Sequence, residues 1–343
     1  MKKACKYGTH RVIFPKGTLP QSADKIDNTM VCYDNEILVE VNTLNIDSAS
    51  FTQIKNACDG DVERMKVMIF EIVNNKGKMQ NPVTGSGGMF LGKILEIGKN
   101  IFTDCQVGDK IASLVSLSLT PLKIDEITDV DLSKDKVRVN GKAILFETGI
   151  FAKIPSDLPD NLVLSALDVA GAAAQVEKLV KKDDTVLILG AGGKSGILCA
   201  YQARKSTGEK GIVIGLTNLE SQREDLKRLN ICDYIIVADA TKPVDVYNKV
   251  REVAPNLADV TINVVNVSNT EMSSILPTKN TGLVYFFSMA TSFTKAALGA
   301  EGIASEAKMI IGNGYTKNHA EFTLDLLRES TELYQLFEER YGD

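Results

Sequence analysis

The sequence predicts an α/β chain of two domains, a β-rich domain followed by a doubly wound parallel sheet. Three observations predict this: a glycine-rich turn after an apolar run at 185–196, further apolar runs alternating with helical segments, and short N-terminal strands between Gly and Pro turns. The 343 residues suffice for two cores. The polar, proline-containing segment 153–160 suggests a linker, so we expect domains at 1–155 and 156–343, with the last helix free to pack back on the first.

The glycine-rich turn reads TVLILGAGGKSG. Thr185–Leu189 has the uninterrupted apolar, β-branched character of a strand buried on both faces. Glycines let the backbone turn tightly and approach a ligand, and the helical composition of Ile197–Lys205 would direct free N–H groups at the turn. This is the arrangement of a diphosphate site in a Rossmann-type nucleotide domain.

The spacing of the turn, GxGxxxG, is one residue looser than the usual dinucleotide fingerprint. A P-loop is excluded because Ile188 stands at the position where its first glycine is needed. An ordinary glycine-rich turn that binds no cofactor is the other alternative, and it stays open. If the turn binds a cofactor, the contacts come from Gly190, Gly192, Gly193, Lys194, Ser195 and Gly196.

The remaining strands are expected at regular intervals along the C-terminal half. Helices are expected at Ser221–Leu229 and Val244–Val253, the second with Thr241 as N-cap. Ser288 and Met289 would follow a strand at the carboxyl edge and touch the nicotinamide. The predicted strands are Gly211–Leu216, Tyr234–Val237, Asp259–Val265, Leu283–Phe287 and Met309–Ile311.

Cofactor preference is usually decided after the second strand, where an acid binds the ribose 2′-OH of NAD. This chain has Thr217 and Asn218 there, and Arg223 follows within reach of a 2′-phosphate. Arg223 could equally be a solvated helix residue, and Glu220 could rotate into the site. These residues slightly favour NADP over NAD as the cofactor.

In the N-terminal half, Glu36–Asn42 alternates between apolar and polar residues as a half-buried strand does. Another strand is expected at Met89–Gly98 and a helix at Val62–Asn74. A net charge of −5 with dispersed Lys and Arg gives no reason to expect nucleic-acid binding. No stretch is apolar enough to cross a membrane and no signal peptide is apparent, so the cytoplasm is expected. Six scattered cysteines and two histidines make a metal site improbable.

Here a resemblance to medium-chain dehydrogenase/reductases becomes visible, through Gly85–Gly98 and the later Val107–Ile111. It implies an N-terminal GroES-like catalytic domain. In zinc-dependent members a His-Glu pair stands where this chain has Ser86 and Gly87, and 44–48 lacks their cysteine ligand. The resemblance is therefore to zinc-free members.

Longer blocks resemble the L-erythro-3,5-diaminohexanoate dehydrogenase family of anaerobic lysine fermentation. The resemblance implies oxidative deamination of the 3-amino group to give 5-amino-3-oxohexanoate, ammonia and NADH. Family members are NAD-linked and several carry an acid where this chain has Thr217, so NAD and NADP both stay open. The blocks are 5–13, 43–51, 77–88, 286–302 and 310–317.

Such a substrate carries one carboxylate and two ammonium groups, so its site needs a cation and one or two acids. Asp47 lies in the loop where related folds place their reaction centre and could hold an ammonium; a turn or N-cap role is the alternative. Lys295 could bind the carboxylate or act as a base, and Glu301 could pair with the second amine. Surface roles stay open for both.

Other readings also stay open. His319 is expected to begin the last helix in a capping or surface role rather than a catalytic one. A zinc-free quinone or enoyl reductase using NADPH, or a non-enzymatic nucleotide-binding protein, would use the same glycine turn. The resemblance implies a homodimer or tetramer, paired through the last strand at Met309–Ile311, with a small diamino acid as the other partner.

Overall fold

The computed structural model describes residues 4–342. The chain divides into two compact units, 1–160 and 161–343, which are described separately here. The predicted fold class, a Rossmann-type parallel sheet preceded by a β-rich domain, is confirmed.

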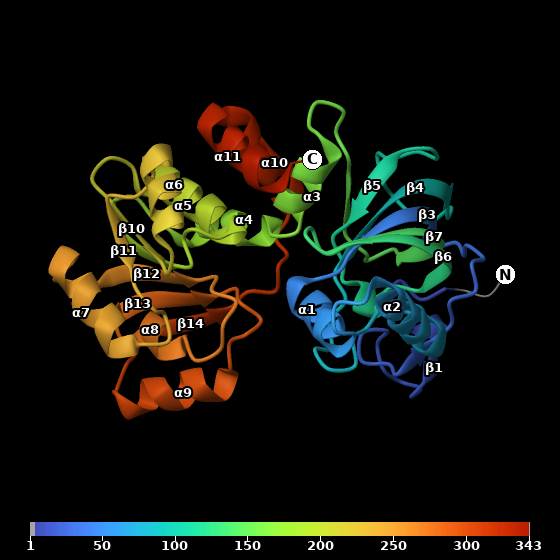
Figure 1. The fold of residues 1–343 in the computed structure, drawn as a ribbon, viewed down its shortest axis with the longest axis horizontal. Helices are drawn as coiled ribbons and strands as arrows, with labels where there is room; N and C mark the ends of the chain where they lie inside the picture. The colour runs from blue at the N-terminus through green and yellow to red at the C-terminus, as the bar shows by residue number, and fades with distance from the viewer. Residues whose placement is uncertain (1–3, 343) are drawn as a thin grey trace. The chain divides into compact units, whose positions relative to one another are not determined.

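The second unit is built on a six-stranded parallel sheet in the order β11-β10-β9-β12-β13-β14 (Figure 1). The chain starts at the centre with β9, moves outward to β11, crosses back and moves outward again, which is the doubly wound pattern. Its switch point lies between β9 and β12. The strands are β9 (Thr185–Leu189), β10 (Ile212–Thr217), β11 (Tyr234–Val237), β12 (Ala258–Asn263), β13 (Thr278–Phe286) and β14 (Lys308–Ile311).

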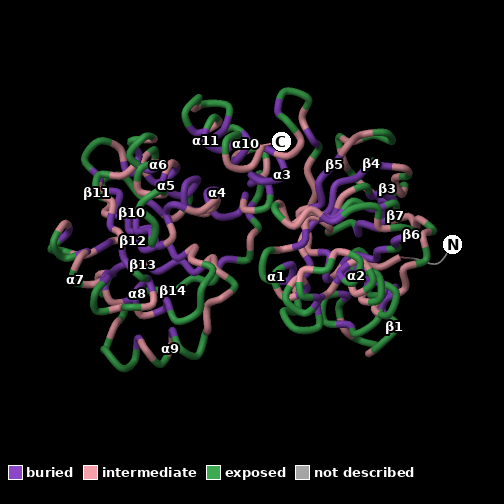
Figure 2. The backbone as a smooth tube through the Cα atoms, in the orientation of Figure 1, coloured by how far each residue is buried: buried purple, intermediate pink, exposed green. Residues whose placement is uncertain are grey.

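Helices cover both faces of this sheet. Figure 1 shows α5 (Lys194–Thr207) and α6 (Glu220–Leu229) on one face, and α7 (Pro243–Val253), α8 (Glu271–Ile275) and α9 (Phe293–Gly302) on the other. The central strands are buried, as Figure 2 shows, because apolar side chains project towards helices on both sides. Around them lie α3 (Asp160–Leu167), α4 (Ala170–Leu179), α10 (His319–Glu329) and α11 (Thr331–Tyr341).

The first unit holds a six-stranded antiparallel sheet in the order β6-β7-β3-β4-β5-β8, with a small β1–β2 pair beside it. Helix α2 packs against β6 and β2, and its apolar residues Met65, Ile69 and Val73 are fully buried. The elements are η1 (Thr9–Arg11), β1 (Val12–Phe14), β2 (Lys25–Ile26), β3 (Glu36–Asn45), α1 (Ser48–Ala57), α2 (Val62–Lys76), β4 (Met89–Ile97), β5 (Lys110–Ser113), η2 (Leu117–Leu119), β6 (Leu122–Asp131), β7 (Lys136–Phe146) and β8 (Phe151–Lys153).

Two local predictions are wrong. The N-cap of α7 is Lys242 rather than Thr241, whose hydroxyl instead donates to the Asp239 carboxylate at 2.7 Å. His319 does begin a helix, but it is only 5% exposed and α11 follows that helix. Burial lowers the pKa of His319, so the ring is kept uncharged inside the unit rather than exposed on its surface. Over residues 4–342, no helix has the length and apolarity needed to cross a bilayer.

Candidate functional site

The glycine-rich turn between β9 and α5 has the tight geometry that its sequence predicts. Gly190 has φ 84°, which favours glycine. A Cβ added to Gly196 would lie only 2.0 Å from the Gly190 carbonyl oxygen, so the first turn of α5 packs directly on the end of β9. The glycine after Ser195 therefore performs the helix-packing role of the third fingerprint glycine, one residue later than usual.

The start of α5 fits a diphosphate. Its N-cap is Gly193, which offers no capping side chain, so the first N–H groups of this 14-residue helix are not satisfied by a side-chain cap. Lys194 stands at the first helical position, where its Nζ lies 2.9 Å from the Asp168 carboxylate. The helix dipole favours an anion at the turn, whereas the charge of Lys194 is balanced by Asp168.

A residue far along the chain also contacts this turn. Arg340, near the end of α11, donates to the Gly192 carbonyl at 2.7 Å and forms an ion pair with Asp225 on α6. The ring of the next residue, Tyr341, lies 5.4 Å from Lys194 Nζ. Sequence reasoning missed Arg340 because no local pattern connects it to a turn 148 positions earlier.

The end of β10 is occupied by a buried polar contact. Thr217 is 1% exposed, and its hydroxyl donates to the Gln222 side-chain oxygen. Gln222 in turn lies against Gly192, where a Cβ would come within 2.4 Å of it. Thr217 is thus linked to the glycine turn through Gln222, a residue that the sequence analysis did not single out.

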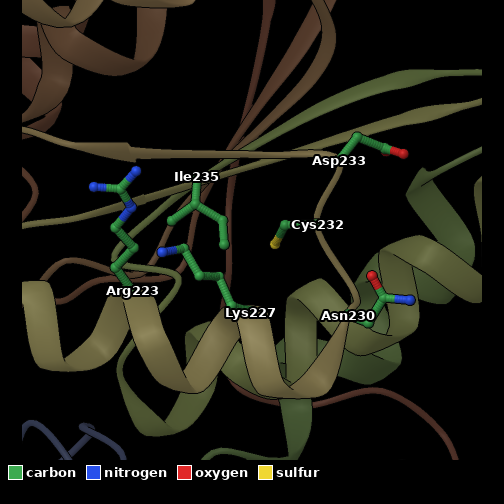
Figure 3. Close-up of a pocket in the computed structure, with 6 residues that line it drawn as sticks. All are labelled: Arg223, Lys227, Asn230, Cys232, Asp233 and Ile235. Carbon is green, nitrogen blue, oxygen red and sulfur yellow. The ribbon is translucent and has the colours of Figure 1, made fainter.

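Arg223 carries less free charge than the sequence suggests. Its guanidinium lies 3.3 Å from the Glu220 carboxylate, in the first turn of α6. It also borders a groove of about 260 Å³ between α6 and the edge strand β11, together with Lys227 and Ile235 (Figure 3). Asn218 follows the end of β10, between Thr217 and this helix.

The candidate substrate residues of the second unit lie beyond β12 and β13. Parallel pairing aligns Asn263 with the last residues of β9 and β13, so the segments that follow begin at one sheet edge. Ser288 donates its backbone N–H to the Asn263 carbonyl at 3.2 Å, and the adjacent Met289 is 80% exposed. Lys295, in the first turn of α9, donates to the Asn269 side chain beyond β12.

Glu301 lies on the same helix as Lys295, and both side chains are exposed. Six residues along an α-helix correspond to a rise of about 9 Å and a rotation of about 240°. Glu301 and Lys295 therefore occupy different faces of α9.

In the first unit, Asp47 is the N-cap of α1 and also part of a polar cluster. Its Oδ1 accepts the Ser50 N–H at 3.0 Å, and its Oδ2 accepts the Ser86 hydroxyl at 2.7 Å. The Ser50 hydroxyl lies 2.6 Å from that of Thr84 and 3.0 Å from that of Ser86. The N-cap role, which was the alternative to ammonium binding, is therefore confirmed for Asp47. The same carboxylate also lies beside three converging hydroxyls.

The loop that carries Ser86 is held firmly. Asn81 is fully buried; its side-chain oxygen accepts two loop N–H groups, and its amide nitrogen donates to Gln53 at 2.7 Å. Gly88 has φ 91°, and a Cβ there would meet the Asn45 carbonyl at 2.1 Å, so this loop lies directly on the one before Asp47. Lys78 anchors its start with a buried ammonium that donates to the Pro20 carbonyl at 2.6 Å. Burial and the neighbouring Lys76 charge lower the pKa of Lys78 to about 8.

The structure gathers the predicted cofactor residues 190–196 in one turn and connects Thr217 to that turn through Gln222. It places Arg223 beside the groove between α6 and β11, and Ser288, Met289 and Lys295 beyond the sheet edge. Asp47 belongs to the other unit, where it gathers Ser50, Thr84 and Ser86. The polar blocks 43–51, which holds Ser50, and 77–88, which holds Thr84 and Ser86, were the signals that could have identified these hydroxyls. Within residues 4–342, no group of three or more His, Cys, Asp or Glu side chains is arranged to hold a metal ion.

Comparison with known proteins places this chain in a family. Residues 10–155 match the model of the L-erythro-3,5-diaminohexanoate dehydrogenase N-terminal domain. Among solved structures, the fold is similar to an alcohol dehydrogenase from Thermotoga maritima, with a TM-score of 0.56 and 13% identity over 91% of this chain and 86% of that one. A mycobacterial protein complexed with NADPH gives a TM-score of 0.56 and 14% identity, over 92% of this chain and 84% of that one.

Two curated relatives are far closer in sequence. L-erythro-3,5-diaminohexanoate dehydrogenase from Acetoanaerobium sticklandii is 58% identical, over 99% of both chains. The enzyme of the same name from Fusobacterium nucleatum is 58% identical over 99% of this chain and 100% of its own length. At this identity over essentially its whole length, the chain belongs to the L-erythro-3,5-diaminohexanoate dehydrogenase family.

Proposed function

We propose that this chain catalyses the nicotinamide-dependent oxidative deamination of L-erythro-3,5-diaminohexanoate to 5-amino-3-oxohexanoate and ammonia. The observation that carries the proposal is the 58% identity, over 99% of the chain, to two curated dehydrogenases of that name. The quinone or enoyl reductase alternative has only the shared fold in its favour, and a purely nucleotide-binding protein would not need the polar cluster at Asp47.

The reaction releases one proton for each substrate molecule. A bound nicotinamide dinucleotide supplies the acceptor for the hydride that leaves C3. The substrate ammonium must first lose a proton to the protein, and the iminium left after hydride transfer is then hydrolysed by water to the ketone and ammonium. The protein's tasks are therefore to accept a proton, to stabilise a cation beside C3 and to fix the substrate carboxylate.

We assign the first task, the acceptance of the proton, to Asp47. A carboxylate offers about four lone-pair positions, and the Ser50 N–H and Ser86 hydroxyl occupy two of them. The others suit an ammonium. Lys295 is the candidate for the substrate carboxylate, and Ser288 and Met289 are candidates to contact the nicotinamide ring. Because Glu301 occupies another face of α9, we rank it behind Lys295 as a contact to the same small molecule.

The glycine turn would hold the diphosphate through the first N–H groups of α5, with the ion-paired side chains of Lys194 and Arg340 beside it. We expect NAD to be preferred over NADP, because Glu220 pairs with Arg223 and would repel a 2′-phosphate. This reverses the preference that the sequence alone suggests, and it agrees with the NAD linkage that the family resemblance implies.

A homodimer or tetramer remains our expectation. The edge strand β14 exposes three consecutive apolar residues, Met309, Ile310 and Ile311, and no strand among residues 4–342 pairs with its outer edge. Unpaired apolar edges are usually covered, and a second copy of β14 would cover this one. The cytoplasm is the expected location, since all six cysteines are free thiols, as is usual in a reducing compartment.

The decisive experiment mixes the purified protein with L-erythro-3,5-diaminohexanoate and either NAD or NADP, following reduced-cofactor absorbance and ammonia together. We expect both products to appear in equal amounts, faster with NAD. Asp47→Asn and Lys295→Met should each reduce kcat/KM by on the order of 10²-fold. Absence of cofactor reduction with either dinucleotide would reject the proposed function, whereas full activity in both variants would reject only the site assignment.

A further inference from the structure

The hydroxyl groups beside Asp47 form a continuous chain that begins at the surface. The Thr84 Oγ1 lies 2.6 Å from the Ser50 Oγ, which lies 3.0 Å from the Ser86 Oγ, which donates to Asp47 Oδ2 at 2.7 Å. Each separation is that of a normal hydrogen bond. Ser50 in the middle is fully buried, while Thr84 at the outer end is exposed.

The charge on Asp47 fixes the direction of this chain. An ionised carboxylate only accepts, so the Ser86 hydroxyl must donate to it. The single hydrogen of Ser86 is then committed, so its oxygen accepts, and Ser50 at 3.0 Å is a nearer donor than Thr84 at 3.4 Å. With Ser50 donating to Ser86, the Ser50 oxygen accepts from Thr84 at 2.6 Å. All hydroxyl hydrogens therefore point inward, towards the carboxylate.

Protonation of Asp47 permits the opposite direction. A protonated carboxyl can donate to Ser86, Ser86 to Ser50, and Ser50 to Thr84, whose own hydrogen then passes to water. In this reversal each of the three hydroxyl oxygens loses one O–H bond and gains another. The net result is that one proton leaves Asp47 and one proton enters solvent at Thr84.

The surrounding structure keeps this chain aligned. Asn81 holds the loop by accepting from the Val83 and Thr84 N–H groups at 2.8 and 3.1 Å. The Ser86 N–H faces the Thr84 hydroxyl at 3.4 Å, which favours an accepting role for that oxygen while Asp47 is ionised. A proton path requires such fixed spacing, because a break of one hydrogen bond stops transfer.

We propose that Thr84, Ser50 and Ser86 conduct the proton that Asp47 takes from the substrate ammonium out to solvent. This inference rests on the proposed function, which releases one proton per turnover at a carboxylate that must be deprotonated again before the next substrate. Asp47 is the catalytic residue in this scheme. The three hydroxyls return the half-buried Asp47 to its ionised state along hydrogen bonds that the fold holds in place.

The test compares Thr84→Val, Ser50→Ala and Ser86→Ala with the wild-type holoenzyme. Thr84 is exposed, so its replacement by an isosteric side chain should leave the fold intact. Thr84→Ser and Ser50→Thr keep a hydroxyl at each position and serve as conservative variants. Thr128→Val is the matched control, because Thr128 is an exposed threonine of the same unit, on β6, that donates only to a backbone carbonyl.

Turnover is measured in dilute and in concentrated imidazole buffer, and in both H₂O and D₂O. We expect the hydroxyl-deleting variants to lose on the order of 10²-fold in kcat at low buffer concentration and to regain most of it when imidazole carries the proton. The wild type should show a solvent isotope effect that involves more than one proton, and these variants should not. If these variants lost activity only through disturbed loop packing, imidazole would not restore their turnover. Their solvent isotope effect would then still involve more than one proton, as in the wild type.

Two outcomes separate the proton path from the reaction itself. Wild-type rates and isotope effects in Thr84→Val and Ser86→Ala would overturn the proton path and leave the proposed function standing. If the wild-type enzyme reduces neither dinucleotide with the diamine, the proposed function and the proton path both fall.

Discussion

We expect single side chains at the end of β10 to decide between NAD and NADP. The spacing correctly identified Thr217 as the residue at the strand end, because the turn and the second strand follow known offsets. The sequence could not show that Arg223 is paired with Glu220 or that Thr217 is paired with Gln222, since both contacts depend on side-chain rotamers. A motif predicts where a group stands; the rotamers determine whether its charge is available.

We therefore predict that Glu220→Gln raises the ratio of kcat/KM with NADP to that with NAD. Removing the carboxylate frees the Arg223 guanidinium and removes repulsion of a 2′-phosphate. Exposed ion pairs contribute about 1 kcal/mol at most, so the ratio should rise up to about fivefold. Glu224→Gln, which breaks the analogous pair with Lys227 at 2.7 Å one turn later, should leave the ratio unchanged. An equal change in both variants would contradict the assignment.

At the scale of elements, α11 acts on the glycine turn although it lies at the other end of the unit's sequence. Arg340 is bound both to the Gly192 carbonyl and to Asp225, and Arg228 on α6 is paired with Glu339 at 2.8 Å. This helix therefore fastens α6 and the turn to each other.

Replacing Arg340 with Ala should loosen the turn and weaken cofactor binding. A hydrogen bond to a charged donor is worth about 1.5–3 kcal/mol, so the Kd for NADH should rise by on the order of tenfold. NADH fluorescence titration measures this directly. Arg328→Ala is the control, because Arg328 pairs with Glu321 and Asp325 within α10. Unchanged NADH affinity in Arg340→Ala would show that α11 does not support the turn.

The edge strand β14 yields a second prediction at this scale. Ile311 is 67% exposed at the end of an apolar edge strand, so Ile311→Lys would place a charge where a second copy of the strand should pair. We expect light scattering to show a dimer for the wild type and a monomer for this variant. Val244→Lys, at a similarly exposed position on α7, should stay dimeric. A monomeric wild type would reject the interface.

At the scale of the whole molecule, acid stability should depend on one buried ion pair of the first unit. Arg11 and Glu36 are 1% and 0% exposed, and Arg11 Nε lies 2.6 Å from the Glu36 carboxylate. Burial by itself would raise the pKa of Glu36, but hydrogen bonds from Arg11 and His10 lower it below its usual 4.5. The stability from this lowered pKa is present above about pH 4.5 and is lost as the pH falls through the folded-state value.

Glu36→Gln should consequently lower the free energy of unfolding by about 3 kcal/mol at pH 7, because Arg11 is left buried without a charged partner. Below pH 4.5 the difference from the wild type should shrink. Urea unfolding across this pH range measures both effects. Glu40→Gln, on the exposed face of the same strand, is the control. A difference that stayed constant with pH would contradict the role assigned to the ionised Glu36.

Much of the architecture could be predicted because it rests on local patterns. The strands of the parallel sheet appear within a few residues of their predicted positions, since uninterrupted apolar runs between glycines mark them. The β6–β7 hairpin was not predicted: β6 reads LKIDEITDVD, and register shifts between Ile124 and Glu126 and between Ile127 and Asp129 break its alternation. The hydroxyl chain at Asp47 was also out of reach, because it joins residues up to 39 positions apart.

The contact between Arg340 and Gly192 also has a consequence during synthesis. The ribosome completes residue 192 well before residue 340, so β9 and the start of α5 emerge while their support from α11 does not yet exist. Cofactor should therefore bind poorly to nascent chains that end before α11 and tightly to chains that include it. In the cell, the dinucleotide would then stabilise the nucleotide-binding unit only after nearly all of that unit has been translated.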